Sequence, residues 1–169
     1  AVLRHAGRPA ATARGWFLQP HDTSAHEGGS FAEMPARDDM PEWTAPDWPG
    51  EFVRTPHMLR AEEQKGRARA WIRPLIPLVE DERISPTARM LGIVDIANGL
   101  TPRVSPHEVA FPNLDLTAHL LREPEGEWVG FDTTMSVGPG GLGITHTVLH
   151  DDRGPVGTSV QSLTVRPMR

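Results

Sequence analysis

The sequence predicts an α+β fold in which an antiparallel sheet wraps around one long central helix. Three observations support this prediction: a strand-like segment precedes a helical one, four more strand-like segments follow it, and short turns join those four. Short turns connect antiparallel neighbours, so the four later segments should form a meander. A sheet curled around a single buried helix is the simplest packing for this order of elements.

The N-terminal part of the chain has a different character from the rest. Residues 1–19 contain a turn signal at Gly7-Arg8-Pro9 followed by a strand-like stretch, and predict a remnant strand or hairpin. Residues 20–65 carry recurrent prolines among acidic residues and glycines with no helical or strand period, and predict an extended linker. Trp43 and Trp48 indicate that parts of this linker pack against other residues. The folded domain is expected at residues 66–169.

The strand and the helix that open this domain have clear signals. In residues 67–73, small or apolar side chains alternate with arginine and tryptophan, which is the period of a strand. Residues 86–98 predict a helix, because Ser85 is a good N-cap, Pro86 suits the first helical position and Gly99 is a natural stop. The helix is apolar around most of its circumference, with a narrow polar strip that includes Asp95, and should be mostly buried.

Four strands are expected after the helix, at residues 114–122, 127–136, 143–150 and 156–166. The turns between them, EPEG, VGPGG and DDRGP, are rich in glycine and proline. A strand, a long buried helix and an antiparallel meander together outline a hotdog fold.

Composition excludes several classes of function. The 169-residue chain has a net charge of −5, which argues against a nucleic-acid surface, and no cysteine, which excludes disulfides and thiolate metal sites. No apolar run approaches the roughly 20 residues of a membrane span. His146 and His150 project from the same strand face, but four residues of strand hold them roughly 13 Å apart, so no metal site is expected. No cofactor is expected either. The N-terminus lacks a signal-peptide pattern and a starting methionine, so we expect a cytoplasmic protein and a fragment or processed product.

Two polar residues stand where strands usually carry apolar ones. Asp115 opens a predicted strand, although strands are depleted in aspartate. Gln161 lies in an apolar strand and needs a hydrogen-bond partner if it is buried. The strand pattern alone does not show that either residue is functional. It is also compatible with a solvated position for Asp115 and with an exposed position for Gln161 on the outer face.

The stretch FPNLDLTAHLLREPEGEWVGFDTT, followed by LHDDRGPVGTSVQSLTV, resembles the second half of acyl-CoA thioesterase II-type proteins, a double-hotdog family that hydrolyses acyl-CoA. The resemblance covers about residues 66–168. Its motif residues are Asp115, Arg122, Glu127-Trp128, Ser136 and Val160-Gln161. The resemblance implies a catalytic triad of Asp115, Ser136 and Gln161. The family's first hotdog half is missing here, except that residues 1–19 resemble its closing strand.

This resemblance implies hydrolysis of acyl-CoA thioesters to free acid and CoA, as in fatty acid metabolism. A thiol leaving group has a pKa of about 8.5, so one carboxylate suffices as general base on water or as nucleophile. Ser136 and Gln161 would assist Asp115. Two alternatives stay open at the residue level: Thr134 in place of Ser136, and Asp95 on the helix as the working acid.

Other functions compete with hydrolysis. Because the first half is missing, the chain could instead be a non-catalytic acyl-thioester-binding hotdog protein or scaffold. A hotdog dehydratase or hydratase is a third alternative, but it usually needs an aspartate–histidine pair. The expected partner is acyl-CoA, with self-association through hotdog pairing because a lone half exposes a sheet edge.

Overall fold

The computed structural model describes residues 1–48 and 50–168, in two compact units, Ala1–Ser30 and Phe31–Arg169. The first unit contains an antiparallel hairpin of β1 (Val2–His5) and β2 (Arg8–Thr12), followed by a 3₁₀ turn, η1 (Ser24–His26). Gly7, with φ of 78°, makes the turn of this hairpin. A hairpin therefore forms within residues 1–19, and its origin as a remnant of a first hotdog half stays a proposal.

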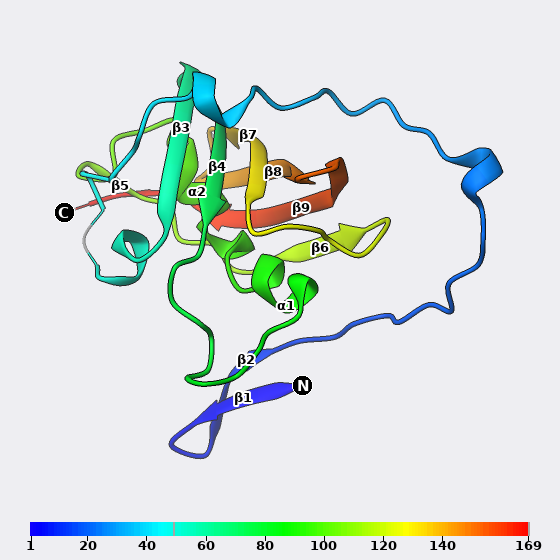
Figure 1. The fold of residues 1–169 in the computed structure, drawn as a ribbon. Coiled ribbons are helices and arrows are strands. Elements are labelled where there is room, and N and C mark those ends of the chain that lie inside the picture. The colour runs from blue at the N-terminus through cyan, green and yellow to red at the C-terminus, as the bar shows by residue number, and fades with distance from the viewer. Residues whose placement is uncertain (49, 169) are drawn as a thin grey trace. The chain divides into compact units, whose positions relative to one another are not determined.

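The second unit is built on a six-stranded antiparallel sheet in the order β3-β4-β7-β8-β9-β6 (Figure 1). The strands are β3 (His57–Gln64), β4 (Arg67–Arg73), β6 (Thr117–Leu120), β7 (Val129–Val137), β8 (Leu142–Asp151) and β9 (Gly154–Thr164). A separate two-stranded ladder pairs β5 (Val109–Ala110) with β10 (Arg166–Pro167). Strands β7, β8 and β9 are three strands of the predicted four-strand meander, but the expectation is wrong for β6, which pairs with β9 at the sheet edge and not with β7.

The helical segment is shorter and more broken than the continuous helix expected at residues 86–98. It consists of α1 (Pro86–Leu91), the 3₁₀ turn η4 (Val94–Ile96) and α2 (Ala97–Leu100). The predicted start is confirmed, because the Ser85 side chain accepts a hydrogen bond from the backbone N–H of Ala88 at 3.1 Å. The break follows Gly92, which caps α1 and precedes two β-branched residues, and both residue types have low helix propensity.

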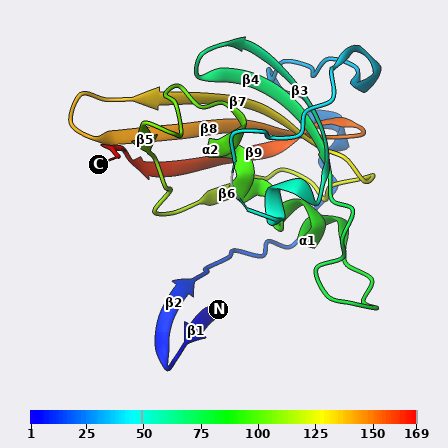
Figure 2. The same cartoon turned by 90° about the vertical axis from the view of Figure 1, so that its left-hand side faces the viewer.

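The helical segment lies on one face of the curved sheet, where the main core forms (Figure 2). Ile72, Phe131 and Leu149 from three neighbouring strands are fully buried, and Val94 and Leu100 pack against them from the helical side. This face is called the inner face below. An antiparallel sheet curved around a central helical segment is a hotdog fold, as predicted from the order of elements.

The N-terminal boundary of the sheet differs from the expectation. Strand β3 lies within residues 20–65, where only an extended linker was predicted, and the second compact unit already begins at Phe31. Glu62, Glu63 and Gln64 are poor strand formers, which hid the strand in the sequence. Cross-strand pairing with β4 overrides that weak propensity. The two tryptophans of this stretch, Trp43 and Trp48, pack against the core, as expected.

Candidate active site

Gln161 is fully buried on the inner face of β9, and it has the partner that a buried glutamine needs. Its side-chain Nε2 donates to the backbone carbonyl of Asp95 at 3.1 Å and to the Asp95 carboxylate Oδ1 at 3.3 Å. Asp95 lies in η4, so this contact ties the helical segment to the centre of the sheet. The amide that the sequence marked as unusual therefore fixes the position of an acid.

The Asp95 carboxylate is exposed to solvent and held from one side only. Asn113 Nδ2 donates to the same Oδ1 at 2.7 Å, so two amides share that oxygen. The other oxygen, Oδ2, makes no hydrogen bond to any described residue. A carboxylate with one oxygen anchored and the other open is arranged to accept a proton from water.

Asp115 occupies a different environment, beside the sheet edge. Its Oδ1 accepts from the backbone N–H of Ser162 at 2.9 Å, and its Oδ2 accepts from the Ser162 hydroxyl at 3.3 Å. The residue precedes β6, which begins at Thr117 and not at residue 114 as expected. The neighbouring Leu114 N–H donates to the Ser162 carbonyl at 2.8 Å, so both residues attach the segment before β6 to β9.

Ser136 and its substitute Thr134 point to the side of the sheet opposite Gln161. Met135 pairs with Thr145, and Thr145 pairs with Gln161, so these three share the inner face. Neighbouring residues along a strand alternate between faces, which puts Thr134 and Ser136 on the outer face. Their burial agrees with this, because Ser136 is exposed whereas Met135 and Gln161 are buried.

The three residues of the sequence-based triad are not joined by hydrogen bonds in the described part of the chain. Ser136 pairs with Ile144 on β8, which in turn pairs with Ser162, the residue that binds Asp115. Two strand spacings separate Ser136 from Ser162, a distance of roughly 10 Å. The structure instead brings together Gln161, Asp95 and Asn113.

An apolar pocket of about 190 Å³ adjoins Asp95. Besides the acid, its lining is largely aromatic and aliphatic, from Trp43, Ala45, Trp48, Phe52, Val53 and Ile96. Gly99 also lines it, next to the Trp48 ring, which brings the indole against α2. The site thus combines one carboxylate with a neighbouring apolar space.

Further polar groups lie on the inner face near Gln161. The buried Gln161 Oε1, Thr145 Oγ1 and Ser159 Oγ have no hydrogen-bond partner among the described residues. Thr133 and Thr147, one row away, bond to each other at 3.0 Å. Unsatisfied buried polar atoms are uncommon, and these three lie on the neighbouring strands β8 and β9, so the inner face has a polar region around Gln161.

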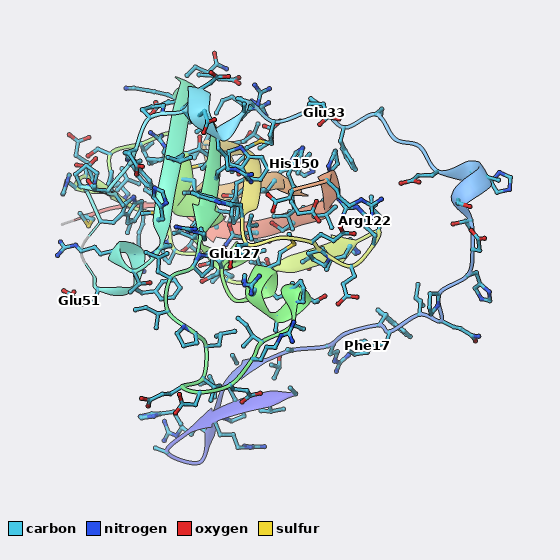
Figure 3. The ribbon with its side chains drawn as sticks, in the orientation of Figure 1. Phe17, Glu33, Glu51, Arg122, Glu127 and His150 are labelled. Carbon is cyan, nitrogen blue, oxygen red and sulfur yellow. The ribbon has the colours of Figure 1, made fainter. Side chains whose placement is uncertain are left out.

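Arg122, another motif residue, has a structural partner. Its guanidinium binds the buried Asp151 carboxylate through two hydrogen bonds of 2.5 and 2.7 Å, beside the β8–β9 turn (Figure 3). Burial alone would raise the pKa of Asp151. The Arg122 hydrogen bonds, the backbone N–H groups of Glu125 and Arg153, and the Arg122 charge outweigh burial and lower this pKa below its usual value. The pair anchors the loop between β6 and β7.

Sequence reasoning missed Asn113 and most of the pocket lining. Asn113 stands two residues before Asp115 in the FPNLD stretch, where an asparagine is easily assigned to a turn. The pocket residues come from the supposed linker. Its three closely spaced aromatic residues, Trp43, Trp48 and Phe52, were the available signal for a packed wall.

Comparison with solved structures shows the same fold. A hot dog fold protein of unknown function from Alicyclobacillus acidocaldarius matches with a TM-score of 0.66 and 15% identity, over 89% of this chain and 60% of that one. A protein assigned as a thioesterase II from Thermobifida fusca matches with a TM-score of 0.61 and 17% identity, over 90% and 59%. An acyl-CoA thioesterase II from Mycobacterium marinum matches with a TM-score of 0.52 and 18% identity, over 84% and 59%.

This chain therefore spans about 60% of the length of each of these structures. No curated protein matches the sequence. None of the described helices is both long enough and apolar enough to cross a membrane.

The family model of the acyl-CoA thioesterase C-terminal domain matches residues 28–165, most of the chain. The chain belongs to the acyl-CoA thioesterase C-terminal domain family.

Proposed function

We propose that this chain hydrolyses acyl-CoA thioesters to a free acid and CoA, with Asp95 as the general base. The observation that carries the proposal is the Asp95 carboxylate, held at Oδ1 by Gln161 and Asn113 and open at Oδ2, beside an apolar pocket. Membership of a thioesterase family supports the reaction class. The apolar pocket suits the acyl part of the substrate, which has no polar groups to satisfy.

The reaction needs one proton acceptor and a good leaving group. Asp95 Oδ2 takes a proton from water as the water oxygen attacks the thioester carbonyl carbon. The tetrahedral intermediate then collapses, the carbon–sulfur bond breaks, and the sulfur leaves as a thiolate that takes the proton from Asp95, which restores the carboxylate. Because thiols have a pKa of about 8.5, departure needs little assistance. Gln161 and Asn113 act as positioning residues, because both donate to Asp95 Oδ1 and leave Oδ2 free for the water.

The competing assignment keeps Asp115 as the acid, with Ser136 and Gln161 as its assistants. It rests on the order and spacing of the family motif. Against it stand the two hydrogen bonds from Ser162, which occupy both oxygens of Asp115 and fit a tether for the sheet edge. Ser136 also projects from the opposite face to Gln161. We therefore favour Asp95.

A second candidate function is binding of acyl thioesters without turnover. The observation that favours it is that Ser136 and Gln161 lie on opposite faces of the sheet, so the residues of the family motif are not gathered at one point. Pairing of two copies, which we also propose, would supply a second hotdog half. Binding alone and hydrolysis make opposite predictions for thiol release.

Release of free thiol from purified chain and acyl-CoA tests the function directly. We expect one equivalent of CoA and one of fatty acid per substrate consumed, from at least one acyl chain length. Saturable acyl-CoA binding without thiol release would identify the binding protein instead. If the chain neither binds nor hydrolyses any of the acyl-CoAs tested, both candidate functions are refuted.

A further inference from the structure

A second apolar pocket adjoins the one at Asp95, and Phe52 is the residue that lines both. The second pocket has a volume of about 240 Å³ and is walled by the loop after β4, with Ile76, Leu78 and Ile84 among its lining residues. Phe52 belongs to the 3₁₀ turn η3 (Phe52–Arg54). No other residue appears in the lining of both pockets within the described ranges.

The two pockets follow one another along the same helical segment. Arg89, Gly92 and Ile93 form the helical wall of the second pocket, whereas Asp95 and Ile96 form that of the first. A path from Asp95 past Phe52 therefore runs along the helical segment towards the start of α1. Ile93 lines the second pocket and Asp95, two residues later, lines the first, so the pockets lie within one ligand's reach of each other.

Phe52 has a fixed backbone and an accessible ring. Its carbonyl accepts from the Thr55 N–H at 3.1 Å and from the Thr55 hydroxyl at 2.9 Å, which holds the turn. Its side chain is 59% exposed, so the ring is not part of the closely packed core. Removing the ring should therefore change the shape of the pockets without unfolding the domain.

The chemistry of both pockets favours an apolar ligand. Apart from the helix residues, the second pocket is lined mainly by proline, isoleucine and leucine. Its one charged group, Arg89, donates to the Gly126 carbonyl at 2.8 Å and is already engaged. A hydrocarbon chain that starts at a thioester beside Asp95 would meet apolar walls in both pockets.

We infer that Phe52 closes the acyl pocket and sets the length of acyl chain that the site accepts. This inference rests on the proposed function, because it takes the pocket beside Asp95 as the place where the acyl chain begins. A dry apolar cavity of about 150 Å³ holds benzene. The first pocket, about 190 Å³, therefore holds a short chain, and opening the second more than doubles the apolar volume.

The test compares wild type with Phe52→Ala on butyryl-, octanoyl-, dodecanoyl- and hexadecanoyl-CoA. We expect wild type to prefer the short substrates, and Phe52→Ala to raise the ratio of long-chain to short-chain kcat/KM by about tenfold or more, since a single methylene changes specificity by at least about that factor. Phe31→Ala is the matched control, because Phe31 is also exposed and lines neither pocket. An unchanged profile in Phe52→Ala overturns the inference.

A binding measurement separates this inference from the proposed function. If wild type hydrolyses no acyl-CoA, the proposed function fails, and calorimetric titration with hexadecanoyl-CoA still tests the pocket. Tighter binding by Phe52→Ala than by wild type and Phe31→Ala supports Phe52 as the closing residue. Equal affinity of all three proteins overturns it. Circular dichroism of each variant verifies that the fold is kept.

Discussion

At the scale of single residues, Gln161 shows both the reach and the limit of sequence reasoning. A glutamine in an apolar strand predicted a buried hydrogen-bond partner, and the structure supplies Asp95. Strand alternation assigns a residue to one of two faces, but it does not say which helical residue lies above it. Alternation also did not relate Ser136 to Gln161, because the register between β7, β8 and β9 is needed to compare their faces.

The Arg122–Asp151 pair predicts a large loss of stability when one partner is removed. In Asp151→Asn, the partly buried Arg122 guanidinium loses its counter-charge, and the new, fully buried amide N–H₂ group faces other donors. Breaking a buried pair in this way costs about 3 kcal/mol or more. Urea unfolding at neutral pH measures the difference. The matched control is Asp152→Asn next door, whose ion pair with Arg37 is more than a third exposed and is worth about 1 kcal/mol or less.

The same pair predicts how stability depends on pH. The pKa of Asp151 is lowered in the folded protein, so its stabilising effect is complete above the unfolded pKa of about 3.9 and is lost as pH falls through the folded value. The gap in unfolding free energy between wild type and Asp151→Asn should therefore shrink as pH is lowered below about 4. If the difference in unfolding free energy between the two proteins stays constant down to about pH 3 and below, this linkage is contradicted.

At the scale of elements, β4 and the β7–β8–β9 part of the meander could be read from the sequence because alternation and turn residues agree there, whereas the pairing of β6 with β9 could not. The helix was predicted at the right place but as one piece, since apolar periodicity does not reveal a break caused by Gly92 and β-branched neighbours. Strand β3 was missed because it gains its conformation from pairing with β4 rather than from its own propensity.

The pairing of β6 with β9 depends on Gly157. A Cβ atom at this position would lie 2.1 Å from the His119 carbonyl oxygen, a backbone atom that cannot move aside within the ladder. Gly157→Ala should therefore detach β6 from the sheet edge and destabilise the domain by about 1–3 kcal/mol. Amide hydrogen exchange should show lost protection in β6. Gly140→Ala is the control, because a Cβ atom there would meet nothing within 4 Å, and it should leave exchange in β6 unchanged.

At the scale of the whole molecule, the hotdog fold followed from the order of elements, but the extent of the site did not. Pocket walls are assembled from residues 43–53 and 95–99, which are far apart in the sequence. Sequence patterns describe such segments one at a time. The residues that give the site its apolar side were therefore assigned to a linker.

The sheet edges predict self-association. On one side, residues 41 and 43 bond to the first half of β3 and leave its second half open, and on the other side β6 is the last strand. Open edges pair with other strands, and two copies would give each a second hotdog half. Light scattering at micromolar concentration should therefore report a dimer. A monomer across that range would contradict this prediction.

Steady-state thiol release by two matched variants tests whether Asp95 is the base for thioester hydrolysis. Asp95→Asn and Asp115→Asn each replace one exposed carboxylate by an amide of the same shape. We predict that Asp95→Asn lowers kcat by roughly a hundredfold to ten-thousandfold, because a general base is lost, whereas Asp115→Asn keeps kcat near the wild-type value. Loss of activity in Asp115→Asn, with activity retained in Asp95→Asn, would contradict the role of Asp95 and restore the assignment drawn from the sequence motif.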